Sequence, residues 1–263
     1  RGLADLGHEI VVLTSRYEKT LPKEEELDGI RIIRVPVMGR LSKGVLMPRL
    51  GSFARKWIAW ADVVNLHLPQ FESCLLSKIA RQLGKPVLVT YHCDLVMSGG
   101  LVNQLAGKVT TLLGRLTLAD AAMIVQNSLD YAEHSPVLKK YLEKVVESPT
   151  PVTVKPVSLE KAQRFRSAHG IAEKDKVIGL AGRVASEKGY QYLAMAFPEI
   201  LEKIPQARIL HAGAWKSVIG ERAYQLQLEE FIRPFGEKWK SLGFLSDEDF
   251  ETFFRVCDLL VFT

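Results

Sequence analysis

The segment from Asp62 to Tyr91 constrains the fold more than any other part of the sequence. It begins with a short apolar run at residues 62–66 and ends with a second one, Pro-Val-Leu-Val-Thr-Tyr, at residues 86–91. Between them, residues 72–83 place apolar side chains at helical spacing: Leu75, Leu76, Ile79, Ala80 and Leu83. A strand, a crossover helix and a second strand of these lengths predict two neighbouring parallel strands.

The same alternation of apolar runs and helical segments extends along the whole chain. Further strand-like runs lie at residues 10–13, 30–35, 121–126, 143–147, 177–181, 207–212 and 258–262. Such alternation is typical of α/β proteins with doubly wound parallel sheets. Residues 148–156 contain three prolines and predict a linker. We therefore expect two Rossmann-like domains, at residues 1–153 and 154–263.

Composition limits the classes of partner. The 263 residues are 47% hydrophobic and carry a net charge of +5, which favours anionic ligands or an anionic membrane surface. The basic residues are dispersed and form no nucleic-acid motif, so we expect no nucleic-acid partner. The three cysteines have no zinc spacing, and no signal peptide or membrane-spanning run is visible. These features predict a cytoplasmic protein.

Between residues 18 and 28 we expect a charged, solvated loop.

Residues 41–60 mix large apolar side chains with Lys and Arg. A basic amphipathic helix within residues 41–60 can touch the inner face of a membrane. More often such a helix packs its apolar side on the domain core. Core packing is the expected outcome, and peripheral membrane contact stays open.

Polar residues follow the strands of the first half. His67 comes after the run at residues 62–66, and His92 and Asp94 come after the run at residues 86–91. In an open α/β sheet, ligands bind outside the carboxyl ends of the strands. Two histidines and a carboxylate there can bind sugar hydroxyls, orient a donor or move a proton. They can also be loop residues bonded to backbone, and the spacing does not favour a metal site.

The segment from Lys176 to Gly189 is a candidate diphosphate site. Its apolar start predicts a buried strand, and a helix is expected to begin with Ser186 as N-cap and Glu187 in the first turn. This would place Arg183 and Lys188 beside the free N–H groups of a helix N-terminus, which attracts anions. A strand–turn–helix with solvated Arg and Lys fits the same residues, and the local sequence leaves both interpretations open.

Taken together, the motifs resemble those of group 1 glycosyltransferases, family 4 of the sequence-based classification. The matching stretches run along nearly the whole chain in the expected order: Leu6 to Thr14, Ala61 to Val64 leading to His67, Val89 to Asp94, Ala119 to Ala121, Asn127-Ser128, Gly182-Arg183, Ser186 to Gly189, Gly243 to Ser246, and Asp258 with the apolar residues after it.

The resemblance implies the two-domain GT-B fold and a retaining transfer of a sugar from a nucleotide-diphospho-sugar to a glycan or lipid-linked acceptor, without a cofactor or metal. It implies that Arg183 and Lys188 neutralise the leaving diphosphate, and that His92 and Asp94 lie near the reacting sugar or the acceptor. The residues expected to bind the donor are Gly182, Arg183, Glu187, Lys188 and Gly213. Those expected on the acceptor side are His67, Asn127 and Ser128.

The chain also departs from the family pattern. The first strand and its Gly-rich loop are missing, as are the paired glutamates that would follow Thr263, and His211-Ala-Gly213 replaces a frequent Gly-x-Gly. We therefore expect a fragment with an incomplete second domain that is inactive by itself. Two other functions stay open on the same scaffold, a nucleotide-sugar epimerase and a non-catalytic nucleotide-sugar-binding module.

Overall fold

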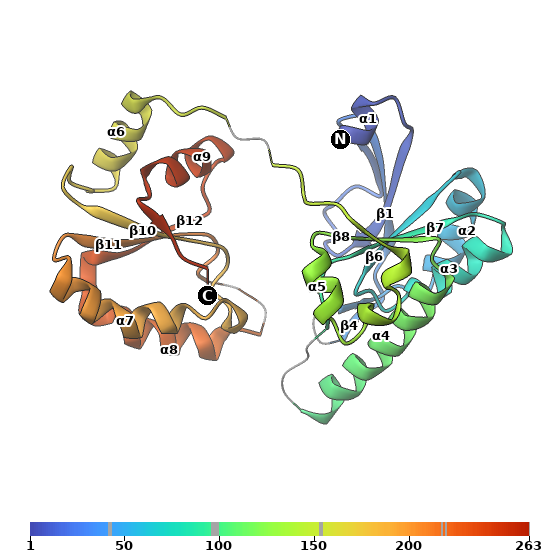
Figure 1. The fold of residues 1–263 in the computed structure, drawn as a ribbon. Helices are drawn as coiled ribbons and strands as arrows, with labels where there is room; N and C mark the ends of the chain where they lie inside the picture. The colour runs from blue at the N-terminus through green and yellow to red at the C-terminus, as the bar shows by residue number, and fades with distance from the viewer. Residues whose placement is uncertain (42–43, 96–99, 153–154, 217, 219, 263) are drawn as a thin grey trace. The chain divides into compact units, whose positions relative to one another are not determined.

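The computed structural model describes residues 1–41, 44–95, 100–152, 155–216, 218 and 220–262. The chain divides into two compact units, Arg1–Pro151 and Val152–Thr263 (Figure 1). The boundary predicted between residues 153 and 154 lies outside the described residues and stays a prediction.

The first unit contains two main sheets. In one, the strands β6 (Val64–Leu68), β7 (Val87–Tyr91), β8 (Met123–Gln126) and β9 (Val145–Glu147) are parallel and lie in sequence order. The helix α3 (Ser73–Gln82) connects β6 to β7, which confirms the predicted parallel pair. In the other, β1 (Ile10–Arg16) is parallel to β3 (Ile30–Pro36).

Two smaller features of this unit were not expected. The predicted loop at residues 18–28 contains a strand, β2 (Glu24–Leu27), which pairs antiparallel with β3. Its glutamates form ion pairs with arginines of β3, Glu24 with Arg31 and Glu25 with Arg34, so a charged segment becomes an edge strand. A short hairpin, β4 (Gly39–Leu41) and β5 (Gly44–Leu46), follows β3.

The helices of the first unit are α1 (Gly2–Asp5), α2 (Leu50–Trp60), α3, α4 (Leu101–Asp120) and α5 (Leu129–His134), with 3-10 turns at Leu138–Lys140 and Leu142–Lys144. The helix α2 buries Leu50, Ala54 and Ile58 in the core. Core packing is thus confirmed for the basic amphipathic segment within residues 41–60.

The second unit is a four-stranded parallel sheet between two helical layers. Its strand order is β12 (Trp239–Gly243), β11 (Ala207–Ala212), β10 (Lys176–Ala181) and β13 (Leu259–Leu260). The helices α7 (Tyr190–Lys203) and α8 (Arg222–Ile232) cover one face, and α6 (Leu159–Ala168) and α9 (Asp247–Val256) cover the other (Figure 1). A 3-10 segment, Arg233–Lys238, leads into β12.

The helix after β10 begins later than the sequence predicted. Ser186–Lys188 form a 3-10 turn, and Gly189 then adopts a left-handed conformation with φ of 59° before α7 starts at Tyr190. Ser186 therefore does not cap α7, and Glu187 does not lie in its first turn. The left-handed glycine separates the turn from the helix, which a reading by residue type does not detect.

Gly179, in the middle of β10, is expected to be essential for packing. A Cβ added there would lie 2.5 Å from Cys257 Sγ and 2.8 Å from Leu260 Cδ2. We expect Gly179→Ala to destabilise the second unit by about 1–3 kcal/mol, because overpacking forces neighbours off their rotamers. Urea unfolding measures the change. Gly100→Ala, where nothing lies within 4 Å, is the control, and equal stability of the two variants would contradict the prediction.

Candidate functional site

The carboxyl end of β10 is the topological switch point of the second unit. The strand β11 lies on one side of β10 and β13 lies on the other, so the chain order reverses there. Ligands of open α/β sheets bind in the crevice outside such a point. The predicted donor-binding residues Gly182, Arg183, Glu187 and Lys188 follow β10 directly, and Gly213 follows β11.

Two glycines bring the backbones of these strand ends into direct contact. Gly182 and Gly213 have φ values of 141° and 139°, and a Cβ added to Gly213 would lie 2.1 Å from the carbonyl oxygen of Gly182. The Gly182 N–H donates to Ala212 O at 2.8 Å, and the Gly213 N–H donates to Gly243 O at 2.8 Å. Only glycine allows this approach.

His211 supports the contact from inside the unit. It is fully buried, its Nε2 lies 2.7 Å from Gly182 O, and its Nδ1 lies 3.2 Å from Ser241 Oγ. Burial lowers the pKa of His211, and the bond to Gly182 opposes that shift. A carbonyl only accepts, so the neutral ring carries its proton on Nε2 and accepts the Ser241 hydroxyl at Nδ1. From the sequence, His211 is only a departure from Gly-x-Gly, and nothing in that motif predicts its hydrogen bond to Gly182 O.

The turn after β10 presents a cation next to a carboxylate. Arg183 Nη2 donates to Glu187 Oε1 at 2.6 Å, and both side chains are about half exposed. Lys188 is exposed, and its Cε would lie 3.9 Å from a Cβ on Gly182, so its stem passes beside that glycine. The predicted Arg and Lys therefore lie at the switch point, and Glu187 orients the arginine.

A buried carboxylate holds this turn in place. Glu221 precedes α8 and is buried, and its Oε2 accepts the Ser186 N–H at 2.9 Å. Sequence reasoning missed Glu221, because it lies 35 residues from its partner and in no recognisable motif.

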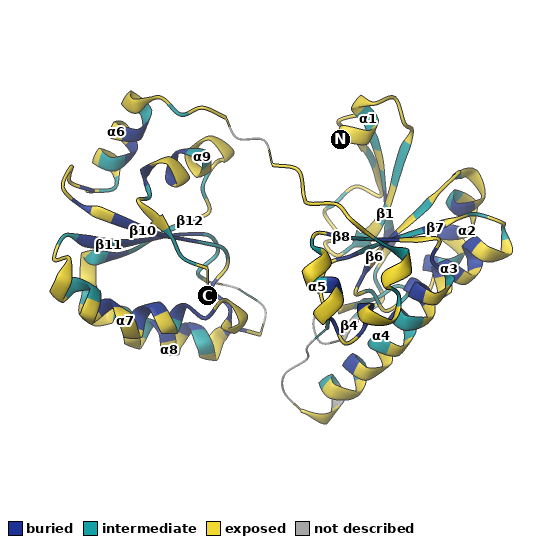
Figure 2. Cartoon of the chain, in the orientation of Figure 1, coloured by how far each residue is buried: buried dark blue, intermediate teal, exposed yellow. Residues whose placement is uncertain are grey.

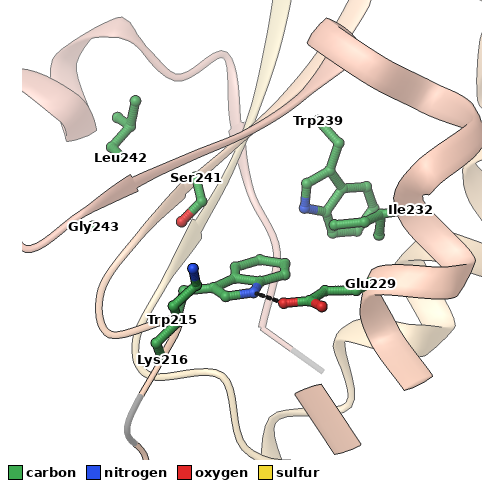
Figure 3. A pocket seen from close by; sticks show the side chains of 8 residues that line it. All are labelled: Trp215, Lys216, Glu229, Ile232, Trp239, Ser241, Leu242 and Gly243. Atoms are coloured by element: carbon green, nitrogen blue, oxygen red, sulfur yellow. Dashed lines mark hydrogen bonds between the residues drawn. The ribbon is translucent and has the colours of Figure 1, made fainter. Parts of the chain in front are cut away.

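A cavity of about 500 Å³ lies near the ends of β11 and β12 (Figure 3). It is lined by Trp215, Lys216, Glu229, Ile232, Trp239, Ser241, Leu242 and Gly243. Trp215 Nε1 donates to Glu229 Oε1 at 3.0 Å, and the Trp215 ring lies edge-on to His211 with centroids 5.4 Å apart. Indole faces and a carboxylate are groups that can hold a planar polar ligand.

In the first unit the two predicted histidines contact each other. His67 Nδ1 lies 2.9 Å from His92 Nε2, and the rings stack with centroids 5.1 Å apart. His67 lies within β6 rather than after it, since the strand extends to Leu68. The parallel register of β6 and β7 places His67 opposite Thr90, which explains the contact.

A chain of hydrogen bonds fixes the protons of this pair. Thr90 Oγ1 donates to Asn65 Oδ1 at 3.1 Å, and Asn65 Nδ2 lies 3.4 Å from His67 Nε2. The amide therefore donates to Nε2, and the neutral His67 ring donates through Nδ1 to His92. Partial burial lowers the pKa of His67, and the positive charge that His92 carries when it is protonated lowers it further. The exposed His92 ring can thus accept a hydrogen bond from His67 at Nε2, and its Nδ1 can form a hydrogen bond to a ligand.

Asp94 is surrounded by hydroxyl groups. Tyr91 and Ser135 each donate to its Oδ1 at 2.8 Å, and Tyr131 donates to its Oδ2 at 3.2 Å. Burial and the Asp94 carboxylate both raise the pKa of Tyr91. A carboxylate held by three hydroxyls suits an anchor for the loop that carries His92. Its position near the reacting sugar or the acceptor remains a prediction.

The remaining acceptor-side residues have local partners. Ser128 caps α5, because its Oγ accepts the Tyr131 N–H at 3.4 Å. The side chain of Asn127 accepts a hydrogen bond from Thr150 Oγ1 at 3.2 Å. Both residues lie at the carboxyl end of β8, and their proposed contacts with an acceptor stay predictions.

The described residues contain no group of three or more His, Cys, Asp or Glu side chains that could hold a metal ion. No helix in the described ranges is long and apolar enough to cross a membrane.

Comparison with protein families identifies both parts of the chain. Residues 1–137 match the family described as glycosyl transferase 4-like domain, and residues 161–263 match glycosyl transferases group 1.

Curated relatives carry transferase or synthase names. An uncharacterized glycosyltransferase of Methanocaldococcus jannaschii is 24% identical over 99% of this chain and 67% of its own length. Mannosylfructose-phosphate synthase of Agrobacterium fabrum is 32% identical, over 99% and 63%. Phosphatidyl-myo-inositol mannosyltransferase of Mycolicibacterium smegmatis is 24% identical, over 80% and 52%. The chain thus spans between half and two thirds of the length of these relatives.

Solved structures confirm the predicted GT-B fold. Sucrose-phosphate synthase from Thermosynechococcus elongatus matches with a TM-score of 0.69 and 17% identity, over 99% of this chain and 66% of that one. Anabaena HepE in complex with UDP and glucose matches with a TM-score of 0.66 and 17% identity, over 89% and 61%.

Acid is expected to destabilise the chain below pH 6.5. Folding lowers the pKa of His67, His169 and His211, mainly through burial, so the unfolded chain binds protons at these positions more readily. The stability they contribute is full above the unfolded pKa of about 6.5 and is lost as the pH falls from there toward the folded values. His134, whose pKa is raised by Asp130, acts in the opposite direction.

The measurement is the melting temperature between pH 7.5 and 5.5 for the wild-type chain and for His67→Asn. The variant lacks one histidine with a lowered pKa, so its melting temperature should fall less over this pH range. An equal or larger loss in the variant would show that His67 is not a source of the pH dependence.

Proposed function

Because the chain belongs to the group 1 glycosyl transferases, we propose that the whole protein transfers a sugar from a nucleotide-diphospho-sugar to a glycan or lipid-linked acceptor, with retention of configuration. The observation that carries the proposal is the turn after β10. It presents Arg183 and Lys188 at the switch point of the second unit, beside the two glycines that bring the ends of β10 and β11 together.

The diphosphate of the donor is proposed to bind at this turn. Arg183 offers a planar fork that can grip two phosphate oxygens, and Lys188 adds a compact charge. As the bond to the sugar breaks, negative charge grows on the diphosphate. Fixed cations there stabilise the transition state more than the ground state, which accelerates the reaction. This role requires no metal, and the proposal includes none.

Glu187 is proposed to act as a placeholder for the phosphate. In this structure its carboxylate occupies the arginine fork, at 2.6 Å from Nη2. A bound diphosphate would take over that position. Glu187 would then contact the donor at its sugar, or the turn that carries Glu187 would make the contact. Glu221 keeps the turn in place during the exchange, because its bond to Ser186 involves the backbone.

The acceptor and the reacting sugar are proposed to meet the first unit at His92. The pair His67–His92 has a defined proton arrangement, and Asp94 anchors the loop that begins there. Asn127 and Ser128 are proposed to lie on the acceptor side of the same unit.

The proposed classes of donor and acceptor rest on the names of similar proteins. A mannosyltransferase whose name contains phosphatidyl-myo-inositol supports a lipid-linked acceptor, and a mannosylfructose-phosphate synthase supports a sugar acceptor. Anabaena HepE, solved with UDP and UDP-glucose, supports a nucleotide-sugar donor. All three cysteines are free thiols, which supports a cytoplasmic location, with peripheral contact at the inner face of the membrane.

Arg183→Ala tests the diphosphate site. Loss of a charge-assisted hydrogen bond is expected to weaken UDP or GDP binding by about 1.5–3 kcal/mol, roughly ten- to a hundredfold. Isothermal titration calorimetry measures the affinity. Arg164→Ala is a matched control, because Arg164 also pairs with a glutamate one helical turn away, Glu160, on an exposed surface of the same unit. A change for Arg183→Ala below about 0.5 kcal/mol would exclude the site.

A panel of UDP-, GDP-, ADP- and dTDP-sugars in a thermal-shift assay identifies the donor. Only a ligand that binds the folded state raises the melting temperature. We expect one nucleotide class to stand out, and its effect to be lost in Arg183→Ala.

A further inference from the structure

The helix α4 exposes most of its large apolar side chains, whereas a helix in a globular unit ordinarily buries them. Five of them share one exposed stripe, with exposed fractions between 37% and 84%: Leu101, Leu105, Val109, Leu112 and Leu116. Their spacing of four, four, three and four residues keeps them on one side of the helix. Figure 2 shows exposed residues along α4.

The inner face of α4 consists mainly of small and polar residues, and Leu118 is its one large apolar side chain that is fully buried among the described residues. Gly107 and Gly114 are buried, and a Cβ on Gly114 would lie 3.5 Å from Leu68 Cδ2. Thr117 is fully buried and donates through Oγ1 to Ser73 Oγ of α3 at 2.9 Å. Small residues therefore let α4 pack closely against α3 and β6, and the five side chains of the stripe point outward. Burial against the described residues of this unit does not account for the stripe.

The charges on α4 and on α3, which packs against it, are mostly positive. The helices α3 and α4 carry four basic residues: Lys78, Arg81, Lys108 and Arg115. Their single acidic residue is Asp120, which is bound to Arg81 at 3.1 Å and mostly buried. An exposed apolar stripe on a helix that also carries Lys108 and Arg115 is the pattern of a helix that lies in the interface of an anionic bilayer. A second copy of this surface would instead oppose like charges.

We propose that α4 docks on an anionic lipid membrane. The stripe extends over about 22 Å of helix, at 1.5 Å per residue, so the helix would lie along the surface and not cross it. This inference deepens the proposed function, on which its catalytic meaning rests, because it favours the lipid-linked class of acceptor. It also assigns the membrane contact to α4, since α2 buries its apolar face in the core.

Co-sedimentation with lipid vesicles tests the docking surface. The 263-residue chain should bind vesicles that contain phosphatidylglycerol and should bind pure phosphatidylcholine vesicles more weakly. Leu105→Gln/Leu112→Gln should reduce binding at least about tenfold, and Lys108→Gln should reduce it by a smaller factor that shrinks at high salt.

The matched control is Met195→Gln/Leu226→Gln, which also replaces two exposed apolar side chains, on α7 and α8 of the second unit. This variant should bind vesicles like the wild-type chain. Circular dichroism checks that each variant is folded, and folding is expected because both replaced leucines are more than half exposed. Arg183→Ala should also keep full vesicle binding, so failure of the donor site and failure of the docking surface give different results.

Three outcomes would overturn the inference. The wild-type chain could fail to bind phosphatidylglycerol vesicles. The stripe variant, Leu105→Gln/Leu112→Gln, could bind them as strongly as the wild-type chain does. Sedimentation velocity could also show a dimer that only the stripe variant dissociates. In that last case the stripe would be an interface between copies of the chain.

Discussion

The contact between Gly182 and Gly213 is the constraint on which the second unit depends. A side chain at Gly213 would overlap the carbonyl of Gly182, so the ends of β10 and β11 approach each other only because Gly213 has no Cβ. The approach brings Gly182 O to His211, whose buried ring also bonds Ser241 of β12. Three neighbouring strand ends are thereby held by one glycine contact and one histidine, and the turn with Arg183 starts from this fixed point.

The first unit positions its polar groups in a different way. Its strand ends carry side chains that bond one another: Thr90 to Asn65, Asn65 to His67, and His67 to His92. Such a chain works only if His67 stays neutral, because a protonated ring could not accept from the Asn65 amide. The lowered pKa of His67 is consistent with that requirement. The asymmetry between the units matches their proposed tasks, since a diphosphate needs fixed cations and a reacting sugar needs defined donors and acceptors.

Much of this arrangement could be predicted from the sequence. The alternation of strands and helices, and the ends of β10 and β11 to within one residue, followed from apolar periodicity. The contact of His67 with His92 did not, because the register of β6 against β7 decides it. Glu221 also escaped, since its partner is distant in sequence. The apolar stripe of α4 would ordinarily predict burial, and only the packing of Gly114 and Thr117 against neighbouring elements shows that the stripe faces outward.

The exposed ion pair of Arg183 and Glu187 explains how the proposed diphosphate site can be ordered before the ligand binds. The ligand can still displace the Glu187 carboxylate. A surface ion pair contributes roughly 0–1 kcal/mol, because solvent screens it and two side chains lose freedom. Hydrogen bonds from a guanidinium to a charged phosphate contribute about 1.5–3 kcal/mol each. Exchange of the carboxylate for a diphosphate is therefore favourable, while the backbone bond between Ser186 and Glu221 remains intact. The cation is kept in position by a partner that is weak enough to be displaced.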